Sequence, residues 1–274
     1  MLVRKRDWWW DVTLGVSGGC RPVPGSPGCV ECFVPAWNNG HPHKSETVHT
    51  GVIKKVKGRW FFNGEVNILG DGDPLWSPLT LAKTKVKNSA LGPGKPLLIW
   101  PADLSDLFIE DCPDHFISRV IATIVQSGHI CLLLTKRTAR MAAFFAALDP
   151  RTAKRWQSQV WLGFSAENQE WFDRRWADVR ALAKAGWFIF VSLAPLLGPV
   201  TLPLDFLALG KRTWVIVAGK QRVPRTRPRP MKAAWARAIR DQCKSAGIPF
   251  FMKQMAGGAP RPRDLRIRDF PTWP

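Results

Sequence analysis

The sequence predicts an α/β fold, organised as a partial TIM-like (β/α) barrel with an irregular insertion after a cysteine-containing loop. From about residue 97 onward, short apolar runs alternate with stretches that have helical spacing of apolar residues. Strands that alternate with helices pair in parallel through right-handed crossovers. About seven strands are expected, one fewer than the roughly eight of a closed barrel. An open doubly wound sheet is the alternative.

The expected strands are short runs rich in Val, Ile, Phe or Trp, each bounded by polar turn residues. They are Val12–Val16, Leu97–Trp100, Ile130–Leu134, Val160–Phe164, Trp187–Val191, Trp214–Val217 and Pro249–Met252. The stretches between them contain good helix formers with apolar residues at helical spacing. The expected helices are Asp114–Gln126, Ala139–Ala147, Gln169–Ala185 and Met231–Ala246.

Residues 33–95 interrupt this rhythm and are interpreted as an insertion between the first and second strands. They are rich in Gly and Pro and contain His41, His43 and His49. A hairpin is expected at Arg59–Leu69. No repeat or linker divides the chain, so residues 1–274 are predicted to form one domain that ends in a basic tail, residues 258–274.

The composition points to a polyanionic partner. Hydrophobic residues make up 46% of the chain and charged residues 22%, which excludes wholesale disorder. No apolar run reaches the roughly 18 residues of a membrane span, and no secretion signal is evident, so a cytoplasmic protein is expected, in the host cell if viral. Forty Lys and Arg against 21 Asp and Glu give a net charge of +19. This favours nucleic acid as partner first and an anionic membrane face second.

One segment concentrates this charge, Lys220–Lys232, which has six basic residues, three prolines and no acid. The prolines exclude a helix, so an extended basic loop is expected. The residues expected to bind phosphates of DNA are Lys220, Arg222, Arg225, Arg227, Arg229 and Lys232.

The strongest chemical signal is a cluster of three cysteines in a loop rich in Gly and Pro. Cys20, Cys29 and Cys32 follow the spacing C-x8-C-x2-C, just after the first expected strand. Three soft thiolates suit an iron–sulfur cluster or zinc. On a four-iron cluster they would leave one iron open to a further ligand. The alternative is a structural zinc site with His41 or His43 as fourth ligand.

Polar residues follow nearly every expected strand. Because carboxyl ends of parallel strands meet at one face of a barrel, these side chains are expected to converge beside the cysteines, where active sites occur. They are Ser105, Asp106, Thr135, Lys136, Arg137, Ser165, Glu167, Asn168, Ser192, Lys220, Lys253 and Gln254. Cys112, Cys131 and Cys243 lie among apolar residues and are expected in the core.

The pattern GC-x8-GC-x2-C followed by an aromatic resembles the cysteine signature of a phage-associated family of atypical radical S-adenosylmethionine (SAM) proteins with a three-Cys motif. The resemblance spans about residues 15–257. It continues in SDLF (Ser105–Phe108), LTKR (Leu134–Arg137), WLGFSAEN (Trp161–Asn168), PLLGPV (Pro195–Val200) and RDQCKSAGIPFFMKQ (Arg240–Gln254).

The resemblance implies a [4Fe–4S] cluster on the three loop cysteines, SAM on the open iron, and an electron donor. Reductive cleavage would yield a 5′-deoxyadenosyl radical that abstracts a substrate hydrogen. By analogy with phage thymidine hypermodification, the expected reaction modifies or isomerises a nucleobase adduct in phage DNA. A non-catalytic nucleic-acid-binding protein with structural zinc is the alternative. The candidate cofactor-binding residues are Ser105, Asp106, Ser165, Glu167, Asn168 and Ser192, and the candidate catalytic residues are Lys136 and Lys253.

Two positions depart from the family's pattern. Ala194 stands where S-x-E-P-L has a carboxylate, and Lys220 stands where G-G-E-S-G has another. Both changes fall at the expected mouth of the barrel and leave the cysteines intact. A divergent substrate is the favoured interpretation, and loss of activity is the alternative.

Overall fold

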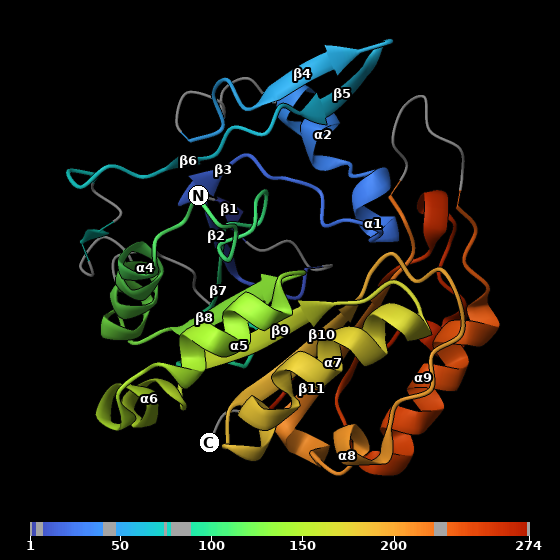
Figure 1. The fold of residues 1–274 in the computed structure, drawn as a ribbon. Helices are drawn as coiled ribbons and strands as arrows, with labels where there is room; N and C mark the ends of the chain where they lie inside the picture. Colours follow the sequence, from blue (N-terminus) through green and yellow to red (C-terminus); the bar gives the residue numbers. More distant parts are fainter. Residues whose placement is uncertain are drawn as a thin grey trace.

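A curled parallel sheet forms the centre of the computed structural model, which describes residues 2–3, 8–40, 48–73, 76–77, 89–221 and 229–272 (Figure 1). Seven strands pair in parallel, and β1 joins β2 antiparallel at one edge. In sheet order the strands are β1 (Leu2–Val3), β2 (Val12–Leu14), β7 (Leu98–Pro101), β8 (Ile130–Thr135), β9 (Val160–Ser165), β10 (Phe188–Leu193), β11 (Thr213–Ala218) and β12 (Phe250–Gln254).

The order of the parallel strands follows the chain from β2 to β12 without reversal. A doubly wound sheet changes direction at a switch point. The doubly wound alternative is therefore wrong, and the mixed α/β fold is a curled half-barrel. All seven predicted parallel strands are confirmed, each within two residues of its expected bounds.

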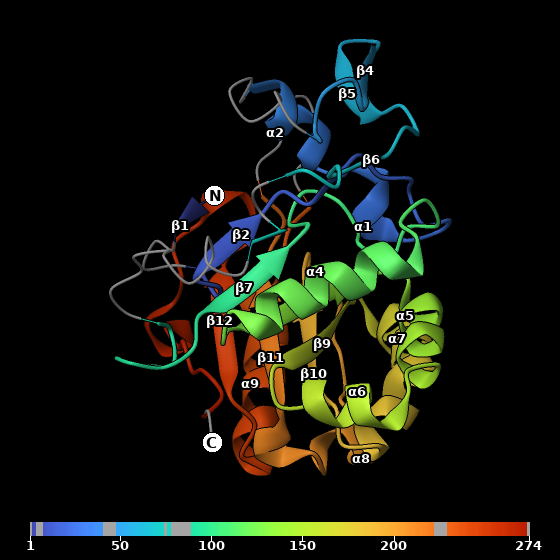
Figure 2. The same cartoon turned by 90° about the vertical axis from the view of Figure 1, so that its left-hand side faces the viewer.

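Helices cover the convex face of the sheet (Figures 1 and 2). The four predicted helices are confirmed as α4, α5, α7 and α9. On this face, the short helices α6 and α8 were not predicted. At the N-terminus of α6, the Asp149 side chain accepts from the backbone N–H groups of Arg151 and Thr152, both at 3.0 Å, and so caps the helix. The helix bounds are α4 (Asp114–Gln126), α5 (Thr138–Ala146), α6 (Pro150–Trp156), α7 (Gln169–Lys184), α8 (Leu204–Leu207) and α9 (Ala233–Ala246).

The two faces of the sheet bury different side chains. Aliphatic and aromatic residues of the convex face pack against the helices, whereas the concave face gathers a separate aromatic cluster around Trp9, Trp10, Phe190 and Trp214. The Phe190 ring occupies the space beside Gly163, where a Cβ atom would lie 2.2 Å from it. The aromatic cluster thus fills the amino-terminal half of the concave side, and a cavity remains toward the carboxyl ends of the strands.

The insertion lies beyond these carboxyl ends, toward which β2 and β7 point (Figure 2). It begins just after α1 (Pro27–Val30) and holds α2 (Val34–Gly40) and a hairpin of β4 (Ile53–Val56) and β5 (Arg59–Phe62). The predicted hairpin at Arg59–Leu69 is therefore misplaced. Its first half, β5, pairs antiparallel with the preceding strand β4. The residues of β4 are mostly exposed and include two lysines, so they show no alternation of apolar and polar residues that would predict a strand. The second half of the predicted hairpin, β6 (Asn67–Ile68), pairs with β3 (Ser17–Gly18).

Among the described residues, no helix is both long and apolar enough to cross a bilayer.

Candidate active site

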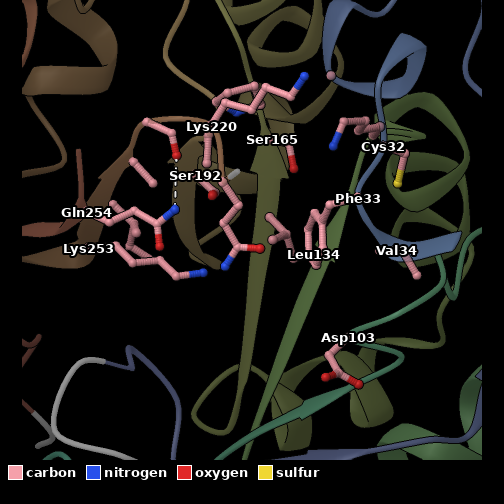
Figure 3. Close-up of a pocket in the computed structure, with 18 of the residues that line it drawn as sticks. Cys32, Phe33, Val34, Asp103, Leu134, Ser165, Ser192, Lys220, Lys253 and Gln254 are labelled. Atoms are coloured by element: carbon pink, nitrogen blue, oxygen red, sulfur yellow. Dashed lines mark hydrogen bonds between the residues drawn. The ribbon is translucent and has the colours of Figure 1, made fainter. Parts of the chain in front are cut away.

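A cavity of about 700 Å³ opens over the carboxyl ends of the parallel strands (Figure 3). One side is formed by the cysteine loop, defined here as residues 19–33, and the other by the ends of β11 and β12. Its size lies within the range of small-molecule sites. Of the residues predicted at strand ends, those that line it are Ser105, Asp106, Thr135, Lys136, Arg137, Ser165, Ser192, Lys220, Lys253 and Gln254. The predicted convergence of these side chains on one face is therefore confirmed.

Cys20, Cys29 and Cys32 all line this cavity and are partly exposed, whereas Cys112, Cys131 and Cys243 are buried in the core. Burial, with the nearby Asp106 carboxylate, raises the pKa of Cys20 to about 12. Burial also raises the pKa of Cys32. Within the described part of the chain, no three His, Cys, Asp or Glu side chains are close enough together to hold a metal ion. His41 and His43 lie outside the described residues.

Asp106 anchors the strand ends near Cys20. Its carboxylate accepts from Thr135 Oγ1 at 2.7 Å and from Arg137 Nη1 at 3.1 Å. Arg137 also donates to the carbonyl of Arg21 at 2.8 Å, inside the cysteine loop. Because the Asp106 oxygens are engaged in this way, the residue connects β8 to the loop and offers little free acceptor capacity to a cofactor.

Glu167 lies beneath the cysteine loop and does not line the cavity, contrary to its predicted place among the cofactor-binding residues. The side chain is fully buried. It accepts from Ser26 Oγ and from Arg175 Nη1, both at 3.0 Å. A Cβ atom added to Gly28 would lie 2.3 Å from Glu167 Oε1, so the loop passes directly over the carboxylate. Glu167 therefore supports the loop from below.

Asn168 also lies away from the cavity lining. Its side-chain oxygen accepts from the backbone N–H of Trp171 at 3.1 Å and caps α7. Helix capping therefore accounts for this residue, and its predicted contact with a cofactor is not supported by its position.

Two basic residues of the Lys220–Lys232 segment, Lys220 and Arg229, contact the cysteine loop. Lys220 forms an ion pair with Glu31, and this contact lowers the pKa of the Glu31 carboxyl. Arg229 Nη1 donates to the carbonyl of Pro27 at 2.8 Å. Lys232 is exposed, with its ammonium 5.8 Å from the centre of the Trp235 ring. Lys220 and Arg229 are thus occupied within the protein, and Arg222, Arg225 and Arg227 lie outside the described residues.

Lys136 and Lys253 have different surroundings. Lys136 Nζ lies 3.9 Å from Glu167 Oε1. Lys253 Nζ lies 5.3 Å from the centre of the Trp10 ring, and no described carboxylate is within ion-pair distance of it. Burial lowers the pKa of Lys253 to about 8. Lys253 therefore presents to the cavity an amine whose pKa lies below the ordinary value for lysine.

Three contributors to the site escaped prediction. Glu31 is the sole acid of the cysteine loop, a signal that could have suggested its cationic partner. Arg175 lies on the apolar face of α7 and is only 2% exposed; a charge on that face could have indicated a buried ion pair. The run Trp8–Trp10 lines the cavity, and three consecutive tryptophans before a strand were a visible signal.

A profile of the family described as "Protein of unknown function (DUF5131)" matches residues 6–264. The chain belongs to this family. The DUF5131 match includes every strand from β2 to β12 and all three loop cysteines. That description names no reaction, cofactor or substrate. Comparison with curated proteins and with solved structures gave no significant match.

Proposed function

We propose that this protein is a radical SAM enzyme that modifies or isomerises a nucleobase adduct, with a modified thymidine of phage DNA as the substrate. The observation that carries the proposal is the position of Cys20, Cys29 and Cys32. All three line the cavity at the strand ends, whereas the other three cysteines are buried in the core. We also propose that the half-barrel is a partial TIM-like barrel, the architecture in which that end carries active sites.

The donor set fits a [4Fe–4S] cluster. Three thiols on a loop rich in Gly and Pro are soft ligands, and they leave one iron for SAM. In this structure the three thiols are not close enough together to bind one metal centre. The loop would therefore have to change conformation to bring Cys20, Cys29 and Cys32 onto one cluster. When bound, a reduced cluster supplies one electron for cleavage of SAM.

The cavity offers polar groups that suit SAM near the cysteines. Ser105, Ser165 and Ser192 all line it, and Ser165 and Ser192 are register partners at the ends of β9 and β10. Their hydroxyls can accept from amine and ribose donors and donate to a carboxylate. We propose these three as cofactor contacts, with Asp106 and Glu167 holding the surrounding chain.

The charge of the cavity favours an anionic substrate. Among the described lining residues, six are Lys or Arg and three are Asp or Glu. Lys253 faces the cavity with no carboxylate partner among the described residues, so it is the stronger candidate for substrate contact than Lys136, which lies near Glu167. A base in duplex DNA would have to flip out to reach this depth, at a cost of about a few kcal/mol.

The test is anaerobic reconstitution followed by incubation with SAM and dithionite. We expect a brown protein with about four irons per chain, since one cluster holds four, and release of 5′-deoxyadenosine. Cys29→Ala should abolish both the chromophore and the product. Cys131→Ala is the matched control: it should keep both and reduce stability by about 1–3 kcal/mol.

A colourless protein with one zinc per chain and no 5′-deoxyadenosine would overturn the proposal in favour of a structural zinc site. Product formation by Cys29→Ala would overturn the ligand assignment. Adding phage DNA to the same reaction then tests the substrate, through a mass change in a nucleoside that depends on SAM.

A further inference from the structure

The floor of the cavity is aromatic. Trp8, Trp9, Trp10 and Trp100 all line it, and Trp8 stacks on Trp10 with ring centres 5.0 Å apart. Trp8 and Trp100 are partly exposed, whereas Trp9 and Trp10 are buried. An aromatic floor of this kind suits the stacking of a flat ring.

A β-bulge beside this floor turns two successive side chains into the cavity. Val217 pairs with Met252 and Ala218 pairs with Gln254, so Lys253 is an extra residue on β12. Successive residues of a regular strand point to opposite faces, and a bulge re-aims one of them. Figure 3 shows Lys253 and Gln254 extending from the same side of the cavity.

These two side chains present complementary hydrogen-bonding groups. Gln254 Nε2 donates to the carbonyl of Gly219 at 3.2 Å, and no described group donates to its Oε1. Oε1 therefore remains as an acceptor. The Lys253 ammonium has three donors. Since the pKa of Lys253 is about 8, the ammonium form predominates at pH 7.

A donor beside an acceptor matches a carbonyl next to a ring N–H. We propose that Lys253 and Gln254 read the edge of a 2,4-dioxopyrimidine ring, of the uracil or thymine type, that lies against the tryptophan floor. Lys253 donates to a ring carbonyl, and Gln254 Oε1 accepts from the ring N3–H. The choice of a pyrimidine rests on the proposed function, whereas the paired donor and acceptor rest on the bulge.

The test uses single-stranded pentanucleotides with one central base and four abasic positions, so that the phosphates are constant. The central base is thymine, N3-methylthymine or cytosine, and affinity is measured by fluorescence anisotropy at fixed salt. We expect the thymine probe to bind about 10-fold more tightly than the N3-methylthymine and cytosine probes, the value of one good hydrogen bond. Gln254→Leu should remove the discrimination against N3-methylthymine, and Gln254→Glu, which keeps an acceptor, should retain it.

Lys253→Met should weaken thymine binding by about 10-fold. Lys244→Met, an exposed change at the end of α9, is the matched control and should leave all affinities unaltered. Equal affinity for the three probes, including no measurable affinity for any, would overturn the inference, as would discrimination that persists in Gln254→Leu. The same measurements on a Cys20→Ser, Cys29→Ser, Cys32→Ser protein separate the two proposals. If this protein still discriminates between the probes, and wild type releases no 5′-deoxyadenosine, then the radical SAM proposal is refuted and the pyrimidine-binding proposal is not.

Discussion

Lys253→Met should increase the stability of the protein at neutral pH. The wild-type ammonium lies over Trp10 in the cavity with no described carboxylate beside it, and burial lowers its pKa from 10.5 to about 8. A difference of about 2.5 between the two pKa values corresponds to about 3 kcal/mol. Because the side chain is partly exposed, solvent reduces this cost, and we expect Lys253→Met to raise the free energy of unfolding by about 2 kcal/mol.

The pH dependence has a defined sign. Between pH 8 and pH 10.5 the unfolded chain binds a proton at Lys253 that the folded chain has lost. The free energy of unfolding of wild type therefore rises with pH through this window. The advantage of Lys253→Met should be full below pH 8 and should disappear by about pH 10.5.

The assay is urea unfolding of both proteins, with reductant present, at several pH values from 7 to 10.5. Subtracting the two free energies of unfolding removes the contribution of the other groups that titrate in this range. Lys244→Met should show no such difference at any pH. A constant difference between Lys253→Met and wild type, or a less stable variant at pH 7, would refute the reasoning.

Three further expectations concern the loop and its partners. Gly28→Ala should destabilise the protein by about 1–3 kcal/mol in thermal unfolding and reduce the amount of bound iron, because the new Cβ would meet the buried Glu167 carboxylate. Gly72→Ala, which has open space around it, should change neither measurement. Arg175→Met should lower the free energy of unfolding in urea by about 3–5 kcal/mol, since it removes the buried cation that pairs with the Glu167 carboxylate. A loss below about 1 kcal/mol would contradict the buried ion pair. Replacing Arg225 and Arg227 with Ser should reduce the slope of log DNA affinity against log salt concentration by roughly two units, one for each lost phosphate contact. An unchanged slope would exclude phosphate contacts by these residues.

The strands and long helices could be predicted because local pattern decides them. A run such as Val160–Phe164 is apolar at every position, and α4 carries apolar residues at helical spacing. The β4–β5 hairpin could not be placed, since Lys54, Lys55 and Val56 are exposed and show no buried alternation. Such a strand is determined by its partner and by the turn, which lie outside a local window.

The candidate site was predictable to the extent that strand ends mark one face of a parallel sheet. What each polar side chain contacts there was not predictable. Glu167 and Ser165 are two positions apart, yet only Ser165 reaches the cavity, because Glu167 is held under the loop by Arg175. The bulge that brings Gln254 beside Lys253 depends on the register between β11 and β12, which the sequence alone does not reveal.

The contacts that shape the cysteine loop also set an order of events during synthesis. Its partners follow far along the chain: Arg137 is 116 residues after Arg21, and Arg229 is 202 residues after Pro27. The three cysteines leave the ribosome early, whereas the side chains that fix their loop are made later, from Arg137 to Arg229. Since long-range contacts form only after the intervening chain is available, the thiols stay unarranged until β11 and the residues after it have emerged. We therefore expect any metal centre on this loop to be inserted after these contacts have formed, and a nascent chain truncated before Lys220 would lack two of the contacts that fix the loop.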